Sequence, residues 1–330
     1  MYTKSKSVHV KSSASLLYNN LSALVIPDKQ LTTYAVVHKT VANLGCCSLS
    51  ESSAVSISHK QVSCKEPSIT HASSILQAKF CCLSGRNILV LCSQQGVQMF
   101  ESDGSVMVFW YALPAAESTQ GLLFTRGIAV LPDNLIAIGT HYGGILVFRV
   151  PSQGTNVTLC QTLKCHDYPI TAIATEGAVM ASADDSGGIT VWETVQDQVG
   201  RVAKINGGGS SCTSLVVYKQ MVIAGYGSGH IRIFDAFKAT MMVEVCAHAR
   251  WIHAIDLAPD SGLLVSTSED TFVRVWSILK KQDDVHIQLE HTEKIQDTQL
   301  TGVQFLDPNG QSFSVSGYDS NVLNHFTKVN

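Results

Sequence analysis

Charged residues are scarce in this chain. They make up 15% of its 330 residues, well below the usual quarter, and the formal net charge is only −3. A weak and balanced charge gives no general attraction to nucleic acid or to an anionic membrane. We therefore expect no nucleic-acid partner.

Long apolar runs are also missing. No stretch approaches the roughly 18 apolar residues that a membrane span requires. The N-terminal residues "MYTKSKSVHVKSS" lack the apolar core of a signal peptide. We expect a soluble, cytoplasmic protein without integral membrane insertion, and peripheral association with vesicles or membranes stays open as an alternative.

The sequence contains no Cys-x-x-Cys motif, although it has ten cysteines. This excludes the usual ligand spacing of a structural zinc site, and it favours free thiols buried in strands. The glycine-rich "NGGGSS" at 206–211 lacks the Gly-Lys-Ser/Thr ending of a phosphate loop, and no helix pattern follows it. We therefore predict no metal, no cofactor and no catalytic residues.

What the sequence does have is a repeat. Six stretches of about 14 residues align without a gap, each ending on an aromatic anchor. In every stretch the residue three positions before the anchor is aliphatic. A short apolar run, a turn of Gly, Ser or Asp, and an alternating run form the pattern of a β-hairpin. The anchors are Phe100, Phe148, Trp192, Phe234, Trp276 and Phe326.

Further short apolar strands precede and follow most hairpins, which gives four strands in each repeat of 40–50 residues. Such a period predicts an all-β protein built as a β-propeller. A more degenerate unit upstream raises the expected number of blades to seven. The expected blades, which form a single domain over 1–330, are 14–64, 70–115, 120–165, 166–207, 208–247, 248–292, and 297–330 plus 6–12.

Two segments outside the hairpins have expected roles. The last repeat ends after its third strand, and the alternating residues 6–12 can supply a fourth strand that closes the ring. Residues 48–74 are rich in serine and are predicted to form a loop, either mobile or a target for phosphorylation, with a plain linker that includes one outer strand as the other interpretation.

The repeats resemble the WD-repeat (WD40) propellers. The best match is "AHARWIHAIDLAPDSGLLVSTSEDTFVRVWSI", which begins just before His248. The resemblance implies a structural tetrad of His248, Ser268, Asp270 and Trp276 in the sixth blade. The other repeats have no aspartate at the turn position of Asp270, so only this blade is expected to hold a full tetrad. The Trp-Asp dipeptide itself is absent.

In this family, the turn after the second strand and the loop before the inner strand share one face of the ring. Tyr, Trp and Arg dominate binding hot spots, and the sequence places several of them there. The predicted partner-binding residues on this face are Tyr142, Tyr168, Asp184, Asp185, Tyr226, Arg250, Trp251, Glu269, Tyr318 and Asp319.

The leading functional hypothesis is a non-enzymatic scaffold or adaptor that binds partner proteins or peptides on this face, with self-association left open. One alternative is a propeller enzyme with a site at the channel mouth, for which His253 and Asp256 are the exceptional inner-strand residues. Another is a phosphoinositide-binding propeller, although the chain has no Arg-Arg pair.

Overall fold

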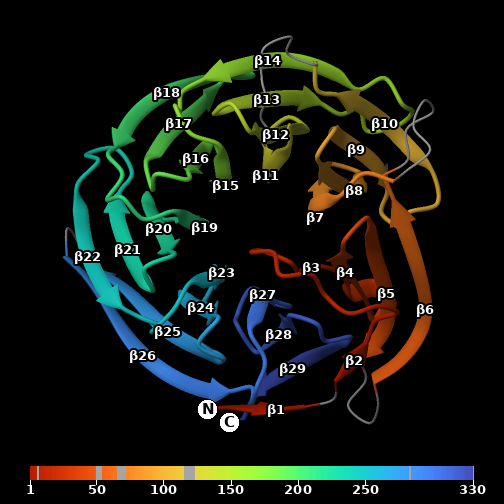
Figure 1. Ribbon diagram of the computed structural model, residues 1–330. Coiled ribbons are helices and arrows are strands. Elements are labelled where there is room, and N and C mark those ends of the chain that lie inside the picture. Colours follow the sequence, from red (N-terminus) through yellow and green to blue (C-terminus); the bar gives the residue numbers. More distant parts are fainter. Residues whose placement is uncertain (6, 50–53, 65–71, 115–122, 282–283, 330) are drawn as a thin grey trace.

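Seven antiparallel sheets stand around a central axis in the computed structural model, which describes residues 1–5, 7–49, 54–64, 72–114, 123–281 and 284–329 (Figure 1). Each sheet is one blade whose strands follow one another from the axis to the rim. The predicted seven-bladed propeller is confirmed.

The first three blades occupy the N-terminal half of the chain. A short 3-10 helix, η1 (Pro27–Lys29), connects the first two strands of blade 1. The strands of blade 1 are β3 (Ser22–Ile26), β4 (Leu31–His38), β5 (Val41–Leu49) and β6 (Ala54–Ser63). Those of blade 2 are β7 (Ile75–Leu83), β8 (Arg86–Ser93), β9 (Gly96–Glu101) and β10 (Met107–Ala112). Those of blade 3 are β11 (Thr125–Leu131), β12 (Leu135–Thr140), β13 (Gly144–Arg149) and β14 (Thr158–Lys164).

The next three blades repeat the same order. Blade 4 consists of β15 (Ile170–Glu176), β16 (Val179–Asp184), β17 (Ile189–Val195) and β18 (Gln198–Ile205). Blade 5 consists of β19 (Cys212–Tyr218), β20 (Met221–Tyr226), β21 (His230–Asp235) and β22 (Met241–Cys246). Blade 6 consists of β23 (Ile252–Ala258), β24 (Leu263–Ser268), β25 (Phe272–Lys281) and β26 (Asp284–Lys294).

Blade 7 combines the two ends of the chain, which lie side by side at the rim in Figure 1. Its C-terminal strands are β27 (Leu300–Phe305), β28 (Ser312–Gly317) and β29 (Val322–Lys328). Two short N-terminal strands, β1 (Tyr2–Lys4) and β2 (Val8–His9), both pair with β29. The predicted closure is therefore confirmed, but two strands make it where one was expected over 6–12.

The serine-rich segment 48–74 is only partly as predicted. Residues 54–63 form β6, the outer strand of blade 1, and pair along β5 with a single irregularity in the register. For these residues the structure has the outer strand of the linker interpretation and not a loop. Residues 50–53 and 65–71 of the segment lie outside the described residues.

Burial follows position within the blade. The second strands β12, β20 and β24 are buried along their whole length, because neighbouring blades cover both of their faces. The outer strand β14 is largely exposed. Full burial of one aliphatic side chain stabilises a fold by roughly 1.5–3 kcal/mol, so these apolar runs supply most of the stability.

Neighbouring inner strands are joined by side chains, since they belong to separate sheets. Gln77 accepts a hydrogen bond from the Gly127 N–H, and Gln304 accepts one from the Ala23 N–H. Asp256 accepts one from the Phe305 N–H over 2.7 Å, and burial raises the pKa of this carboxyl to about 6. These links hold the inner ring together.

The segment that leads into β3 crosses the middle of the ring (Figure 1). The Asn19 N–H donates to the His253 carbonyl, and the Asn19 side chain bonds to Thr213 and Ser214 of blade 5. The guanidinium of Arg126 in blade 3 lies 3.7 Å from the Tyr18 ring centroid. The N-terminal segment therefore covers one mouth of the central channel.

Candidate protein-interaction face

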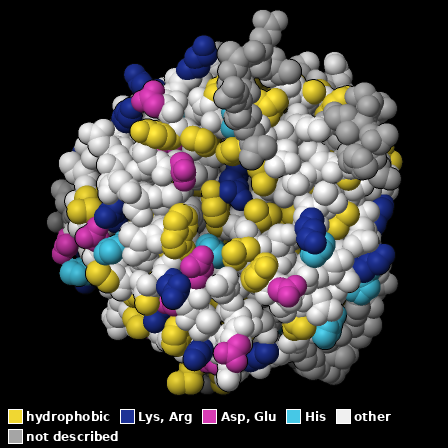
Figure 2. All heavy atoms as spheres, in the orientation of Figure 1, with side chains coloured by type: hydrophobic (Ala, Val, Ile, Leu, Met, Phe, Trp, Pro, Cys, Tyr) yellow, Lys and Arg dark blue, Asp and Glu magenta, His cyan; other side chains and the backbone are white. Residues whose placement is uncertain are grey.

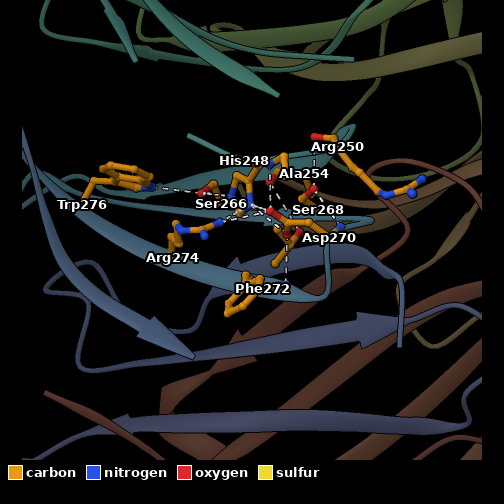
Figure 3. Close-up of polar contacts among 11 residues, drawn as sticks. His248, Arg250, Ala254, Ser266, Ser268, Asp270, Phe272, Arg274 and Trp276 are labelled. Atoms are coloured by element: carbon orange, nitrogen blue, oxygen red, sulfur yellow. Dashed lines mark hydrogen bonds and ion pairs between the residues drawn. The ribbon is translucent and has the colours of Figure 1, made fainter. Parts of the chain in front are cut away.

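A buried chain of hydrogen bonds joins four side chains of blade 6. His248, in the loop before β23, has its Nδ1 3.0 Å from both carboxylate oxygens of Asp270 and its Nε2 2.8 Å from Ser266 Oγ. The Trp276 Nε1–H donates to the same serine oxygen over 3.0 Å. Figure 3 shows these side chains in the order Trp276, Ser266, His248, Asp270. The network ties the incoming loop to the second and third strands.

The protonation of this network follows from what each group can donate. A carboxylate only accepts, so the two contacts with Asp270 assign the proton to His248 Nδ1, and Nε2 accepts from the Ser266 hydroxyl. Arg274 Nη1, which lies 2.7 Å from Nδ1, donates to Asp270 Oδ2 over 3.2 Å. Burial lowers the pKa of His248. Burial alone would raise the pKa of Asp270, but hydrogen bonds from His248 and from two backbone N–H groups lower it overall. The pair is a neutral imidazole on a carboxylate.

The structure assigns a different serine to the tetrad than the sequence did. Ser268 lies two residues further along β24, and its hydroxyl donates to the Arg250 carbonyl and accepts from the Asp270 N–H. It therefore stabilises the turn and does not contact His248. The prediction of Ser268 is wrong, and Ser266 takes its place.

Blade 4 holds a second complete network. His166 Nδ1 lies 2.7 Å from Asp184 Oδ2, and the Ser182 hydroxyl joins His166 Nε2 to the indole N–H of Trp192. Asp184 is buried, and hydrogen bonds from His166 and Ser186 outweigh its desolvation and lower its pKa. Two predictions are therefore wrong: blade 6 does not hold the only tetrad, and Asp184 is not presented to a partner.

Blade 5 fills the same corner with an aromatic ring. Tyr226 is 1% exposed, so the prediction that it contacts a partner is wrong. A Cβ at Gly187, in the turn of blade 4, would lie 3.3 Å from the Tyr226 ring. The guanidinium of Arg232 lies 4.6 Å from the centroid of the ring. The neighbouring blade and this arginine cover the tyrosine.

We call one side of the ring the loop face. It carries segment 14–21, the loops that lead into the inner strands and the turns between second and third strands. In blade 6 the Glu269 N–H of the turn donates to the Trp251 carbonyl of the loop, and in blade 7 the Tyr318 N–H donates to the Gln299 carbonyl. Turn and loop of each of these blades therefore share one side.

Large side chains are exposed on the loop face. Figure 2 shows hydrophobic side chains gathered around the middle of the ring, with single charges of both signs between them. The exposed fractions are 46% for Leu16, 44% for Tyr142, 54% for Tyr168, 43% for Trp251 and 47% for Tyr318. The sequence predicted four of these five, and Leu16 was missed because the first blade has no clear hairpin pattern before residue 21.

Trp251 is the best-supported of these side chains. Its indole lies over Gly227 in the turn of blade 5, where an added Cβ would be 3.0 Å from the ring. Only a glycine leaves room for this contact. The charged residues predicted on the same face, Arg250, Asp185 and Asp319, are exposed. Glu269 is half-buried, with its Oε1 3.3 Å from His253 Nε2.

The inner-strand residues His253 and Asp256 take part in contacts between blades. His253 Nδ1 donates to the Leu300 carbonyl over 2.8 Å, and Asp256 binds the backbone of β27. Within the described part of the chain, no cluster of three or more His, Cys, Asp or Glu is placed to hold a metal ion. Across these same residues, no helix is long and apolar enough to cross a membrane.

Comparison with solved structures supports the fold. The chain matches a chain of "Crystal Structure of Mitotic Checkpoint Complex" with a TM-score of 0.75 and 14% identity, covering 99% of this chain and 92% of that one. It matches "Structure of U3-55K" with a TM-score of 0.71 and 13% identity, covering 97% and 98%. At such identities the likeness shows the fold alone.

The ring of seven blades and the two His–Ser–Trp–Asp networks define a WD-repeat propeller, as the sequence resemblance predicted. A family model described as WDR54 matches residues 1–329, and the chain belongs to this family. It is 41% identical to WD repeat-containing protein 54 of Mus musculus and 38% identical to that of Homo sapiens, over all of both chains in each case.

Proposed function

We propose that this protein is a non-enzymatic interaction scaffold that binds a partner protein or peptide on its loop face. The carrying observation is the set of five large, half-exposed side chains on the loop face. Aromatic side chains with one face buried and one face in water are the residues that dominate binding hot spots. The family membership supports the same role.

The rigidity of the face supports this proposal. Hydrogen bonds hold the loops before β15 and β23 through His166 and His248. A surface that is ordered before binding loses little conformational entropy when a partner docks. Trp251 and Tyr168 therefore act as fixed anchors, and Asp185 and Arg250 select the charge of the partner.

The proposed place of action is the cytoplasm, where the scaffold assembles partner complexes. The cysteines of the described residues are thiols and not disulfides. Free thiols are typical of proteins that work in a reducing compartment. A second copy of the protein is an alternative partner for the loop face. The experiment below separates this self-association from binding of other proteins.

The test is proximity labelling in cells with Trp251→Ala, Tyr168→Ala and Asp185→Lys, each compared with the wild type. Loss of a hot-spot side chain costs roughly 2 kcal/mol or more, so labelling of direct partners is expected to fall about tenfold or more. Size-exclusion chromatography of each purified variant reports whether it remains folded and whether it self-associates.

Phe237→Ala is the matched control. Phe237 is 39% exposed, close to the value for Trp251, but it lies between β21 and β22 on the opposite side of the ring. The control is expected to keep the wild-type partners. If the folded loop-face variants keep every partner as well, the proposed function is wrong.

A further inference from the structure

Three cysteines of the chain are exposed, and one of them has a base in contact with it. Cys246 ends β22, and its Sγ lies 3.3 Å from His230 Nε2. The two residues stand directly opposite each other in the antiparallel pair of β21 and β22. Directly opposed side chains project from the same face of a sheet. The contact is therefore fixed by the register of the two strands.

The histidine is oriented by the turn before it. His230 Nδ1 lies 3.0 Å from Ser228 Oγ and 3.2 Å from the Ser228 carbonyl oxygen. A carbonyl accepts only, so Nδ1 carries the proton and Nε2 presents a lone pair to the thiol. A nucleophile, a base within reach and a group that orients the base is the arrangement that activates cysteines.

The next cross-strand pair on the same face is an ion pair, so its carboxylate already has a partner other than His230. Arg232 and Glu244 stand opposite each other two residues along the same two strands and form an ion pair of 2.5 Å. Glu244 is therefore engaged with the guanidinium.

The other exposed cysteines have different surroundings. The Cys160 thiol donates to the Thr158 carbonyl over 3.7 Å and interacts with the Arg149 guanidinium, which stabilises negative charge but has no lone pair to take a proton. Burial raises the pKa of Cys82, which disfavours its thiolate. Among the buried thiols, burial raises the pKa of Cys81 and of Cys92 to about 12. Burial therefore disfavours the thiolates of Cys81, Cys82 and Cys92.

We propose that Cys246 is a nucleophilic cysteine that undergoes exchange with small-molecule disulfides of the oxidised-glutathione class. The thiol proton passes to His230 Nε2 as Cys246 Sγ attacks one sulfur of the disulfide. A new Sγ–S bond forms and the original S–S bond breaks. The leaving thiolate takes the proton from the imidazolium and departs as a thiol, which leaves Cys246 in a mixed disulfide.

The experiment treats the reduced full-length protein with oxidised glutathione at pH 7 and follows each cysteine by mass spectrometry after acid quenching. Base assistance raises the rate of nucleophilic attack, so Cys246 is expected to react about tenfold faster than Cys82 or Cys160. His230→Gln keeps a polar side chain but removes the base, and is expected to lower the Cys246 rate by a similar factor.

His286→Gln is the matched control. His286 is an exposed histidine of β26 whose Nε2 lies 2.9 Å from Asp284 Oδ2, so this variant is expected to react at the wild-type rate. The comparison among thiols of the wild type does not depend on any variant. Equal rates at the three exposed cysteines would overturn the proposal, and so would a Cys246 rate unchanged by His230→Gln in a folded protein.

Discussion

Blades 5 and 6 are neighbours in the ring and differ most clearly where their second strands end. In blade 6 the buried corner holds His248, Ser266 and Trp276, joined by hydrogen bonds. In blade 5, Ala224 and Phe234 occupy the positions that match the serine and the tryptophan. The register is the same in both blades, because Val222 pairs with Phe234 as Leu264 pairs with Trp276.

The difference shows that the polar network is not needed to form a blade. A buried polar network gains little over well-packed apolar groups, because its hydrogen bonds must offset the desolvation of its members. What the network adds is a link from the incoming loop to the strands. Asp270 accepts hydrogen bonds from the N–H groups of Ala249 and Phe272, one on each side of that link.

The largest effect is expected from Asp270→Ala. The change leaves the buried imidazole N–H of His248 and the backbone N–H groups of Ala249 and Phe272 without their charged acceptor. A hydrogen bond to a charged group contributes about 1.5–3 kcal/mol, so the loss of several is expected to cost about 3–5 kcal/mol in total. Tyr226→Phe in blade 5 removes one hydroxyl and is expected to cost less than about 1.5 kcal/mol. Urea unfolding at pH 7, followed by tryptophan fluorescence, measures both.

The pH dependence of Asp270→Ala has a definite sign. The folded protein holds the pKa of Asp270 below its ordinary value. The stabilisation by its carboxylate is therefore present above the unfolded-state pKa of about 4 and is lost as the pH falls below it. The difference between wild type and variant is expected to be full at pH 7 and smaller at pH 3. Equal losses for Asp270→Ala and Tyr226→Phe would contradict the comparison of the two blades.

Replacement of Ser266, the serine at the centre of the blade-6 network, is expected to lower stability by a smaller amount. Ser266→Ala leaves the Trp276 N–H and His248 Nε2 without a hydrogen-bond partner. The variant is expected to lose about 1–3 kcal/mol of unfolding free energy. Ser182→Ala in blade 4 is the parallel case and should lose a similar amount, since the same contacts are present. Thermal and urea unfolding measure the losses. A neutral effect in both blades would mean that the hydrogen bonds contribute nothing to stability.

The sequence was sufficient to predict the ring, because the hairpin pattern and the aromatic anchors are local. Which of Ser266 and Ser268 joins the network depends on the pairing between strands and not on the local sequence. The two serines lie on the same face of β24, and only the position of Trp276 on the neighbouring strand decides which one it contacts.

Two residues of the candidate site were misplaced for reasons of packing. The alignment without gaps set Ser186 against Asp270, whereas Asp184 reaches its histidine from the end of β16. Tyr226 was expected at the surface because a tyrosine beside glycines in a turn is usually exposed. Its burial depends on Gly187 of the neighbouring blade and on Arg232, and a hairpin pattern does not contain that information.

The smallest expected change in stability concerns Thr271, in the turn between β24 and β25 of blade 6. Thr271 has a φ of +74°, and its Oγ1 is buried without a hydrogen-bond partner among the described residues. The matching turn positions in blades 3, 4 and 5 are Gly143, Gly187 and Gly229, all with positive φ. A β-branched residue is strained in this region.

Thr271→Gly is therefore expected to stabilise the protein by about 0.5–1 kcal/mol, because relief of strain exceeds the entropy that glycine adds to the unfolded chain. Gly229→Thr is the reverse exchange in blade 5 and should be strongly destabilising, since a Cβ there would lie 2.1 Å from the His248 carbonyl oxygen. Urea unfolding of both variants decides the point. A loss of stability in Thr271→Gly would mean that blade 6 depends on the threonine side chain itself and that the turns of the two blades are not equivalent.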